Sequence, residues 1–114
     1  MKIKAKVPKE VGYGCHKYRV ALENRHLTGN YGDVDHLLQE LAIRNDLPPS
    51  RKLVAFVHEN IHIIEGVFNI GLDEHQVELL GEGIGQLFAN LGIELDWSDI
   101  PTKTAVIKEA KEEK

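Results

Sequence analysis

The second half of the chain contains two successive segments whose apolar residues recur at helical spacing, and this pattern constrains the fold more than any other feature. The first segment follows residues 48–50, Pro-Pro-Ser, which are typical of a helix start, and it ends at Gly66. The second begins at Asp73, an N-cap residue with Gln76 three positions later as in a capping box, and it ends at Gly92. The apolar positions are Leu53, Val54, Val57, Ile61 and Ile64 in the first segment and Val77, Leu80, Ile84, Leu87, Phe88 and Leu91 in the second. The pattern predicts two amphipathic helices, each with one face to bury.

The first third of the chain has the period-two alternation of strands. Residues 2–7 and 16–22 alternate polar and apolar side chains, which predicts strands with one exposed face. Gly, Asn and Asp residues on either side of residues 16–22 indicate turns. Residues 37–43 fit a short helix or a strand, and we favour the strand because a turn follows at residues 45–49. We therefore expect an α+β fold in which a small N-terminal antiparallel β-sheet packs on two main helices.

The length and composition fit one domain. The chain has 114 residues, of which 42% are hydrophobic and 28% charged, which is enough for one core. Residues 102–114 consist mainly of Lys, Glu and Ala and offer little apolar surface to bury. We predict a single domain over residues 1–101, followed by a charged C-terminal tail over residues 102–114.

Charge and cysteine content limit the partners and the compartment. The formal net charge of −4 provides no basic surface for a phosphate backbone, so we do not expect a nucleic-acid partner. Cys15 is the single cysteine, which excludes an intramolecular disulfide and indicates a reducing compartment. The first nine residues lack the apolar run of a signal peptide, and no later segment approaches the ~18 apolar residues of a membrane span. We expect a cytoplasmic protein without membrane contacts.

A metal-binding motif lies within the first predicted helix. Residues 57–62 read Val-His-Glu-Asn-Ile-His, which matches the H-E-x-x-H pattern of zinc peptidases. Residues four apart lie on one helix face, so His58 and His62 can bind one Zn²⁺ at about 2.0 to 2.1 Å. Zinc lowers the pKa of a bound water to about 7, and the carboxylate of Glu59 is placed to accept its proton. The motif predicts a zinc-dependent hydrolase with Glu59 as the general base; the alternative is a helix with two surface histidines.

A catalytic zinc usually takes a third protein ligand. Glu74, Glu78 and Glu82 of the second helix lie at about 90°, 130° and 170° from its apolar stripe, so Glu82 is expected to face solvent. Gly81 and Gly85 lie on the side of the first two glutamates and would allow the helices to approach closely. We favour Glu78, because Glu74 is in the first turn, where a carboxylate also stabilises the helix dipole. The alternative is that all three glutamates are solvated surface charges.

The histidines outside the motif and the tyrosines do not occur at the spacing of a metal-binding pair. We interpret the other histidines as surface residues; they are His16, His26, His36 and His75. A tyrosine hydroxyl could polarise a substrate carbonyl. Nothing in the sequence selects one of Tyr13, Tyr18 and Tyr31 for this task.

The chain resembles the small zincin-like metallopeptidases encoded by bacteriophages and prophages. The resemblance extends over about residues 3–91, and its specific part lies in residues 47–51, 58–62 and 72–78. It implies a minimal zincin-like fold with a small twisted sheet, a motif helix and a second helix whose Gln-Val-Glu glutamate, here Glu78, is the third zinc ligand. It also implies hydrolysis of a peptide or protein substrate in the cytoplasm of a bacterial host. The glycine-rich residues 81–85 depart from the pattern and could weaken the second helix.

Two other functional classes are alternatives to a peptidase. A catalytically weak or inactive zincin-like binding or regulatory protein of phage origin would keep the metal and recognise a partner through its sheet edge. The intact Glu59 favours the enzyme, because a structural zinc needs no carboxylate there. A nucleobase deaminase is excluded, because its H-x-E and P-C-x-x-C elements are absent.

Overall fold

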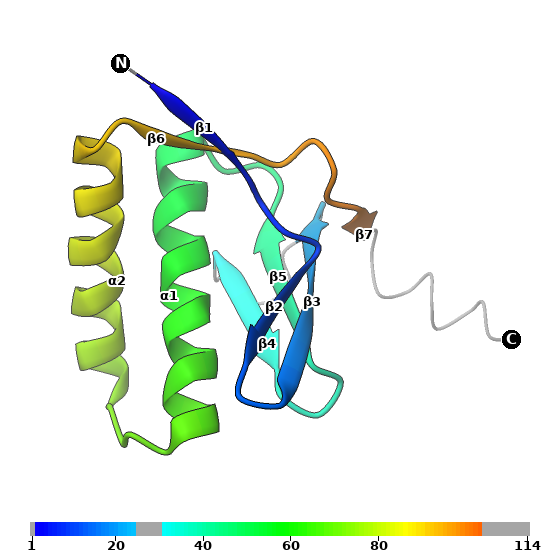
Figure 1. Cartoon of the computed structure of the whole chain (residues 1–114), viewed down its shortest axis with the longest axis vertical. Helices are drawn as coiled ribbons and strands as arrows, with labels where there is room; N and C mark the ends of the chain where they lie inside the picture. Colours follow the sequence, from blue (N-terminus) through cyan, green and yellow to red (C-terminus); the bar gives the residue numbers. More distant parts are fainter. Residues whose placement is uncertain (1, 25–30, 104–114) are drawn as a thin grey trace, which may run out of the picture.

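The computed structural model describes residues 2–24 and 31–103, and its strands and helices form an α+β domain (Figure 1). Along these residues the elements follow in the order β1 (Ile3–Lys6), β2 (Glu10–Tyr13), β3 (His16–Glu23), β4 (Gly32–Asp35), β5 (Glu40–Arg44), α1 (Pro49–Phe68), α2 (Glu74–Asn90), β6 (Ile93–Asp96) and β7 (Thr102–Lys103). The expected α+β class and the two main helices are confirmed.

The main sheet is mixed, so the prediction of an antiparallel sheet is wrong at its centre. Its strand order is β2-β3-β5-β4, with β7 pairing on β3. The outer pairs β2/β3 and β4/β5 are antiparallel, whereas β3 and β5 run parallel, with Val20 opposite Leu41. The reason is that β4 lies on the edge of β5 that faces away from β3. The chain runs back along β4 and then turns into β5, which therefore runs in the same direction as β3. Residues 20–22 and 41–43 are all buried, as is typical of strands covered on both faces.

Two of the C-terminal strands were not predicted. β6 pairs in parallel with β1, with Ile3 opposite Ile93, and forms a separate two-stranded sheet. β7 pairs with β3, with Leu22 opposite Thr102, so the sheet takes in the first two residues of the predicted tail. The rest of the predicted tail, residues 104–114, lies outside the described residues. These strands are short and pair with distant partners, which local alternation cannot show.

Both helices begin where the sequence indicates. α1 has Pro48 as an extended N-cap and ends at Phe68, and its C-cap Asn69 adopts a left-handed conformation with φ 53°. It therefore continues past Gly66, the predicted end. α2 has the predicted capping box: the Asp73 carboxylate accepts from the Gln76 backbone N–H at 2.8 Å, and the Gln76 side chain accepts from the Asp73 N–H at 2.9 Å. No helix among the described residues is long and apolar enough to cross a membrane.

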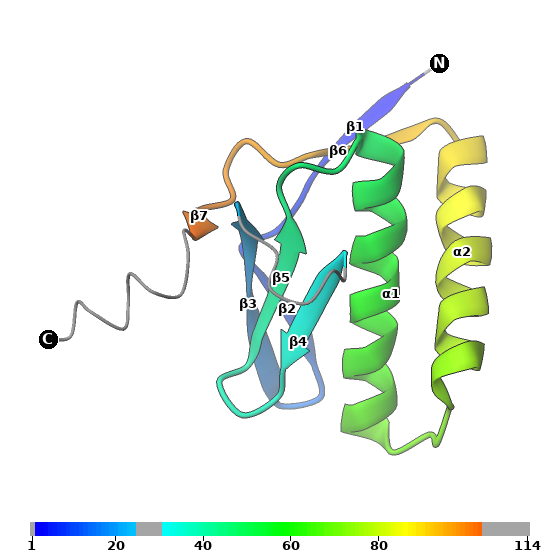
Figure 2. The same ribbon diagram turned by 180° about the vertical axis from the view of Figure 1, so that it is seen from behind.

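The elements form layers in which α1 lies between the main sheet and α2 (Figures 1 and 2). One face of α1, including Ala55 and Ile63, packs with the buried strands β3 and β5. Another face, with Val57 and Ile61, packs on Val77 of α2. Of the two helices, α1 is therefore the one that packs on the main sheet, and α2 is stabilised mainly by α1. The residues of α1 that face neither the sheet nor α2 directly are available to form a site.

Candidate metal centre

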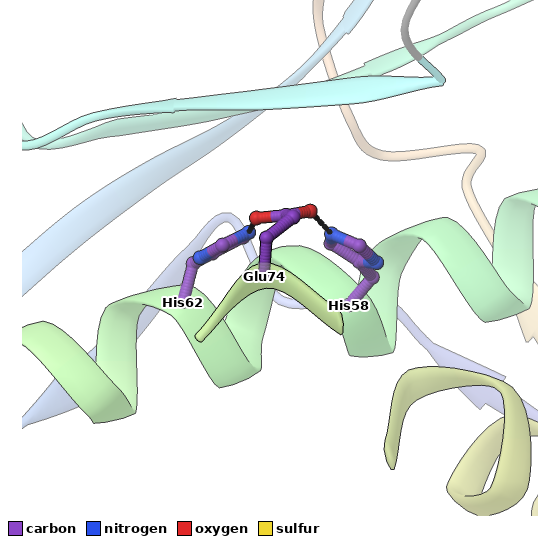
Figure 3. Close-up of side chains that lie close together, drawn as sticks. All are labelled: His58, His62 and Glu74. Carbon is purple, nitrogen blue, oxygen red and sulfur yellow. Dashed lines mark ion pairs between the residues drawn. The ribbon is translucent and has the colours of Figure 1, made fainter. Parts of the chain in front are cut away.

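His58, His62 and Glu74 form one group of ligand-type side chains at the surface between α1 and α2 (Figure 3). The Nε2 atom of His58 lies 3.4 Å from Oε2 of Glu74, and Nε2 of His62 lies 3.1 Å from Oε1. One ligand atom from each residue lies within 4.8 Å of the other two. Ligands at about 2.0 to 2.1 Å from a tetrahedral zinc are about 3.3 Å apart. The two His–Glu distances are close to that spacing, so the three side chains form a possible metal site, and its nitrogen and oxygen donors are types that bind zinc.

Local structure explains why these three side chains meet. His58 and His62 are one turn apart on α1, and their ring centroids are 4.9 Å apart. Glu74 is the first residue of α2, directly after the N-cap Asp73. Asn69 and Gly71 both have positive φ values, 53° and 86°, which lets the connection reverse the chain so that α2 returns along α1.

The structure brings Glu74, rather than the predicted Glu78, to the two imidazoles. Glu78 lines the same pocket but does not belong to the ligand group. The reason is the contact face of α2, which is centred on the buried Val77, Gly81 and Gly85 rather than on the apolar stripe used for the prediction. Glu74 is seven residues before Gly81 and therefore only about 20° from it around the helix, whereas Glu78 is about 60° away. The two glycines were the sequence signal that could have selected Glu74.

Glu59 is a buried carboxyl group that follows His58 in α1 and lines the same pocket. Its exposed fraction is 7%, and no hydrogen bond or ion pair joins it to another described residue. Burial, followed by the charges of Asp33 and Glu74, raises its pKa from 4.5 to about 8. A Cβ atom on Gly32 of β4 would lie 3.0 Å from the Glu59 Cγ atom, so this glycine leaves the space that the side chain occupies. An unpaired buried carboxyl group is costly for stability and therefore indicates a functional role.

A pocket of about 630 Å³ opens above this group. Five carboxylates line it, those of Asp33, Glu59, Glu74, Glu78 and Glu82, and no described Lys or Arg does. Glu82 is exposed, as expected, but it also lies at this pocket. The pocket therefore has a strongly negative lining that a bound cation would partly neutralise.

The pocket runs along the edge of β4. The consecutive residues 31–34 all line it, and since side chains alternate between the faces of a strand, such a run indicates contact with the strand's edge. β4 is the last strand on its side of the described sheet. Leu41 and Ile43 of β5 are fully buried in the centre of the sheet. The strand that borders the pocket is therefore β4, and residues 41–43 of β5 do not line it.

His36 also lines the pocket, and it is exposed, as expected for a surface histidine. Its Nδ1 atom lies 2.9 Å from the hydroxyl oxygen of Tyr18, and the two rings meet edge-on with centroids 5.8 Å apart. His16 and His75 are exposed and do not line this pocket, and His26 lies outside the described residues. The local sequence around His36 does not predict its contact with Tyr18.

Comparisons of the chain with models of known protein families, with curated proteins and with solved structures find no significant match. The functional assignment therefore depends on the residues of the site and their geometry.

Proposed function

We propose that this protein is a zinc-dependent metallopeptidase in which His58, His62 and Glu74 bind the ion and Glu59 is the general base. The observation that carries the proposal is the meeting of two imidazoles and a carboxylate next to a buried, unpaired glutamate in one pocket. A purely structural zinc site would have no use for that glutamate, because structural sites fill all positions with tightly bound ligands.

The chemistry follows from the positions of the side chains. A bound zinc ion would polarise the substrate carbonyl and lower the pKa of water. Glu59 takes one proton from the attacking water and returns it to the departing amine. A carboxyl group with a pKa of about 8 would be mostly protonated at neutral pH. The positive charge of an ion bound at His58 and His62 would lower that pKa and make Glu59 competent as a base.

The edge of β4 supports a peptide as the substrate. No described strand pairs with the outer edge of β4, so an extended peptide can pair with it through main-chain hydrogen bonds. Such pairing would place the scissile bond in the pocket with little selectivity for side chains. A motif helix beside an open strand edge also agrees with the resemblance to the zincin-like phage metallopeptidases. The substrate we propose is therefore a flexible segment of a peptide or protein.

The test combines metal analysis with hydrolysis of a mixture of unstructured peptides. We expect close to one zinc per chain and cleavage by the wild-type protein. In Glu59→Gln, zinc content should persist while hydrolysis falls by about 10²-fold or more. Glu10→Gln is the matched control, because Glu10 is an exposed glutamate on β2 that does not line the pocket.

Two results would contradict the proposal. Absence of zinc uptake would exclude the metal site itself. Zinc binding without cleavage, or cleavage that Glu59→Gln leaves unchanged, would favour the regulatory module that binds partners at the β4 edge.

A further inference from the structure

Apart from the zinc ion that the proposed function assigns to it, the pocket has few groups that can stabilise negative charge on a substrate. When water adds to a peptide carbonyl, the carbonyl oxygen gains negative charge and needs a hydrogen-bond donor or a cation. Five side chains of the described lining are carboxylates, which repel that charge. Apart from the two metal-binding histidines, the side-chain donors of the lining are the hydroxyl of Tyr31 and the imidazole of His36.

Three elements hold the His36 ring in place. It directly follows β4, and its Nδ1 atom contacts the hydroxyl of Tyr18 on β3, a residue only 3% exposed. On the other side, a Cβ atom on Gly66 of α1 would lie 3.2 Å from the His36 Cε1 atom, so the ring lies against the helix. Gly66 is four residues beyond His62, about 6 Å along the helix axis. The His36 ring, although partly open to solvent, is thus held by Tyr18 and α1 at the pocket that the histidines of the metal group also line.

The contact with Tyr18 selects the tautomer of His36. If Nδ1 carried the proton, the Tyr18 oxygen would accept it and the buried hydroxyl hydrogen would have no acceptor among the described residues, which is costly. If Tyr18 donates to Nδ1, both groups are satisfied and the proton of the ring lies on Nε2. Nε2 then carries a donor that no described residue uses.

Tyr31 is less well suited to this task. Its ring lies beside the guanidinium groups of Arg44 and Arg51, 5.9 and 5.5 Å from the ring centroid. Arg51 is seven residues before His58, about 10 Å along α1, so this cluster lies near the far end of the helix from Gly66. These contacts hold Tyr31 toward the start of the helix rather than toward His62.

We infer that His36 is a catalytic residue that donates its Nε2–H to the substrate carbonyl oxygen as this oxygen becomes an oxyanion, and that Tyr18 is its positioning residue. This inference rests on the proposed function. The water oxygen bonds to the carbonyl carbon, the carbonyl π electrons move to its oxygen, and the water proton goes to Glu59. The C–N bond then breaks and the amine receives that proton. His36 keeps its own proton throughout and contributes only a hydrogen bond.

The first test is the tautomer of His36, measured by ¹⁵N NMR of the imidazole with and without zinc. We expect the Nε2–H form in the wild type and a mixture of both forms in Tyr18→Phe. This readout needs no enzymatic activity. A wild-type protein in the Nδ1–H form would overturn the inference, whatever its activity.

The second test compares His36→Ala, His36→Gln and the wild type, all loaded with zinc. In His36→Ala we expect kcat to fall by about 10²- to 10³-fold, as for loss of one oxyanion donor, with KM and zinc content unchanged. Affinity for an N-phosphoryl dipeptide, which carries a tetrahedral anion, should fall in the same variant, while His36→Gln restores part of both because its amide can donate. His16→Ala is the control, since His16 is an exposed histidine of β3 outside the pocket.

The outcomes separate the two claims. An active wild type whose kcat and phosphoryl-dipeptide affinity do not change in His36→Ala overturns the inference and leaves the proposed function intact. Loss of zinc in His36→Ala also overturns it, because His36 would then act through the metal site. A zinc-loaded wild type without hydrolysis contradicts the proposed function, while phosphoryl-dipeptide binding still decides whether His36 contacts the anion.

Discussion

Gly81 of α2 lies directly against His58 of α1: a Cβ atom on this glycine would come within 3.2 Å of both the Cα and the Cβ atom of the histidine. One turn later, a Cβ atom on Gly85 would lie 2.9 Å from a methyl carbon of Val54. The glycines thus set the distance between the two helices. Because Glu74 lies on the same face two turns before Gly81, the same contact also sets the distance from its carboxylate to the imidazoles.

Gly81→Ala is therefore expected to weaken zinc binding as well as the fold. The added methyl group would push against the backbone of His58, and overpacking of this kind costs about 1–3 kcal/mol. Gly83→Ala is the matched control in the same helix, because nothing lies within 4 Å of its Cβ position. There the gain in helix propensity should stabilise the protein by up to about 1 kcal/mol. Urea unfolding and zinc titration of both variants test this. If Gly81→Ala and Gly83→Ala stabilise the protein equally, the close contact between Gly81 and His58 is contradicted.

Replacing Glu74 and Glu78 separately tests the choice of third ligand. In Glu74→Ala, zinc affinity should fall by more than the 10- to 100-fold typical of outer-shell substitutions, because a group 3.1 Å from the His62 Nε2 atom is removed. Glu78→Ala, one turn further along α2, should lose no more than about 10-fold. Competition with a zinc-binding dye measures both. If the larger loss occurs in Glu78→Ala, the ligand expected from the family resemblance is the correct one.

The metal-free protein should become less stable as the pH rises. The pKa of Glu59 is about 8 in the folded state against an ordinary value of 4.5, so between these values the folded state binds more protons than the unfolded state. Its contribution to stability is present below pH 4.5 and is lost as the pH rises through 8, with a slope of at most about 1.4 kcal/mol per pH unit. Glu59→Gln should remove this slope. Unfolding in chelator at several pH values measures it, and Glu10→Gln should unfold like the wild type.

The acidic lining should favour substrates with basic side chains. We expect peptides with Lys or Arg next to the scissile bond to be cleaved with a kcat/KM about 10-fold above matched peptides with Glu, and the ratio should fall at high salt. The double variant Glu78→Gln/Glu82→Gln should reduce the preference while leaving the metal group in place, because both residues line the pocket outside that group. A preference that this variant and salt leave unchanged would show that the negative charge does not select the substrate.

Helical periodicity and capping chemistry are local properties, and the sequence determined them well. Spacing alone placed His58 and His62 on one face of α1, because four residues make about one turn. Glu59 lies between them in the sequence. The capping box of Asp73 and Gln76 likewise needs only neighbouring atoms. The α+β class followed from the change of period between the two halves of the chain.

Tertiary structure alone decided the rest of the site. Glu74 rather than Glu78 meets the imidazoles because the helices touch at Gly81, and a helical wheel centred on apolar residues does not reveal a contact made by glycines. His36 enters the pocket through a hydrogen bond to Tyr18, a partner on another strand. The parallel pairing of β3 with β5 also depends on which strand edges meet. Each of these contacts joins segments distant in sequence, and only the packing of the chain decides which of them come together.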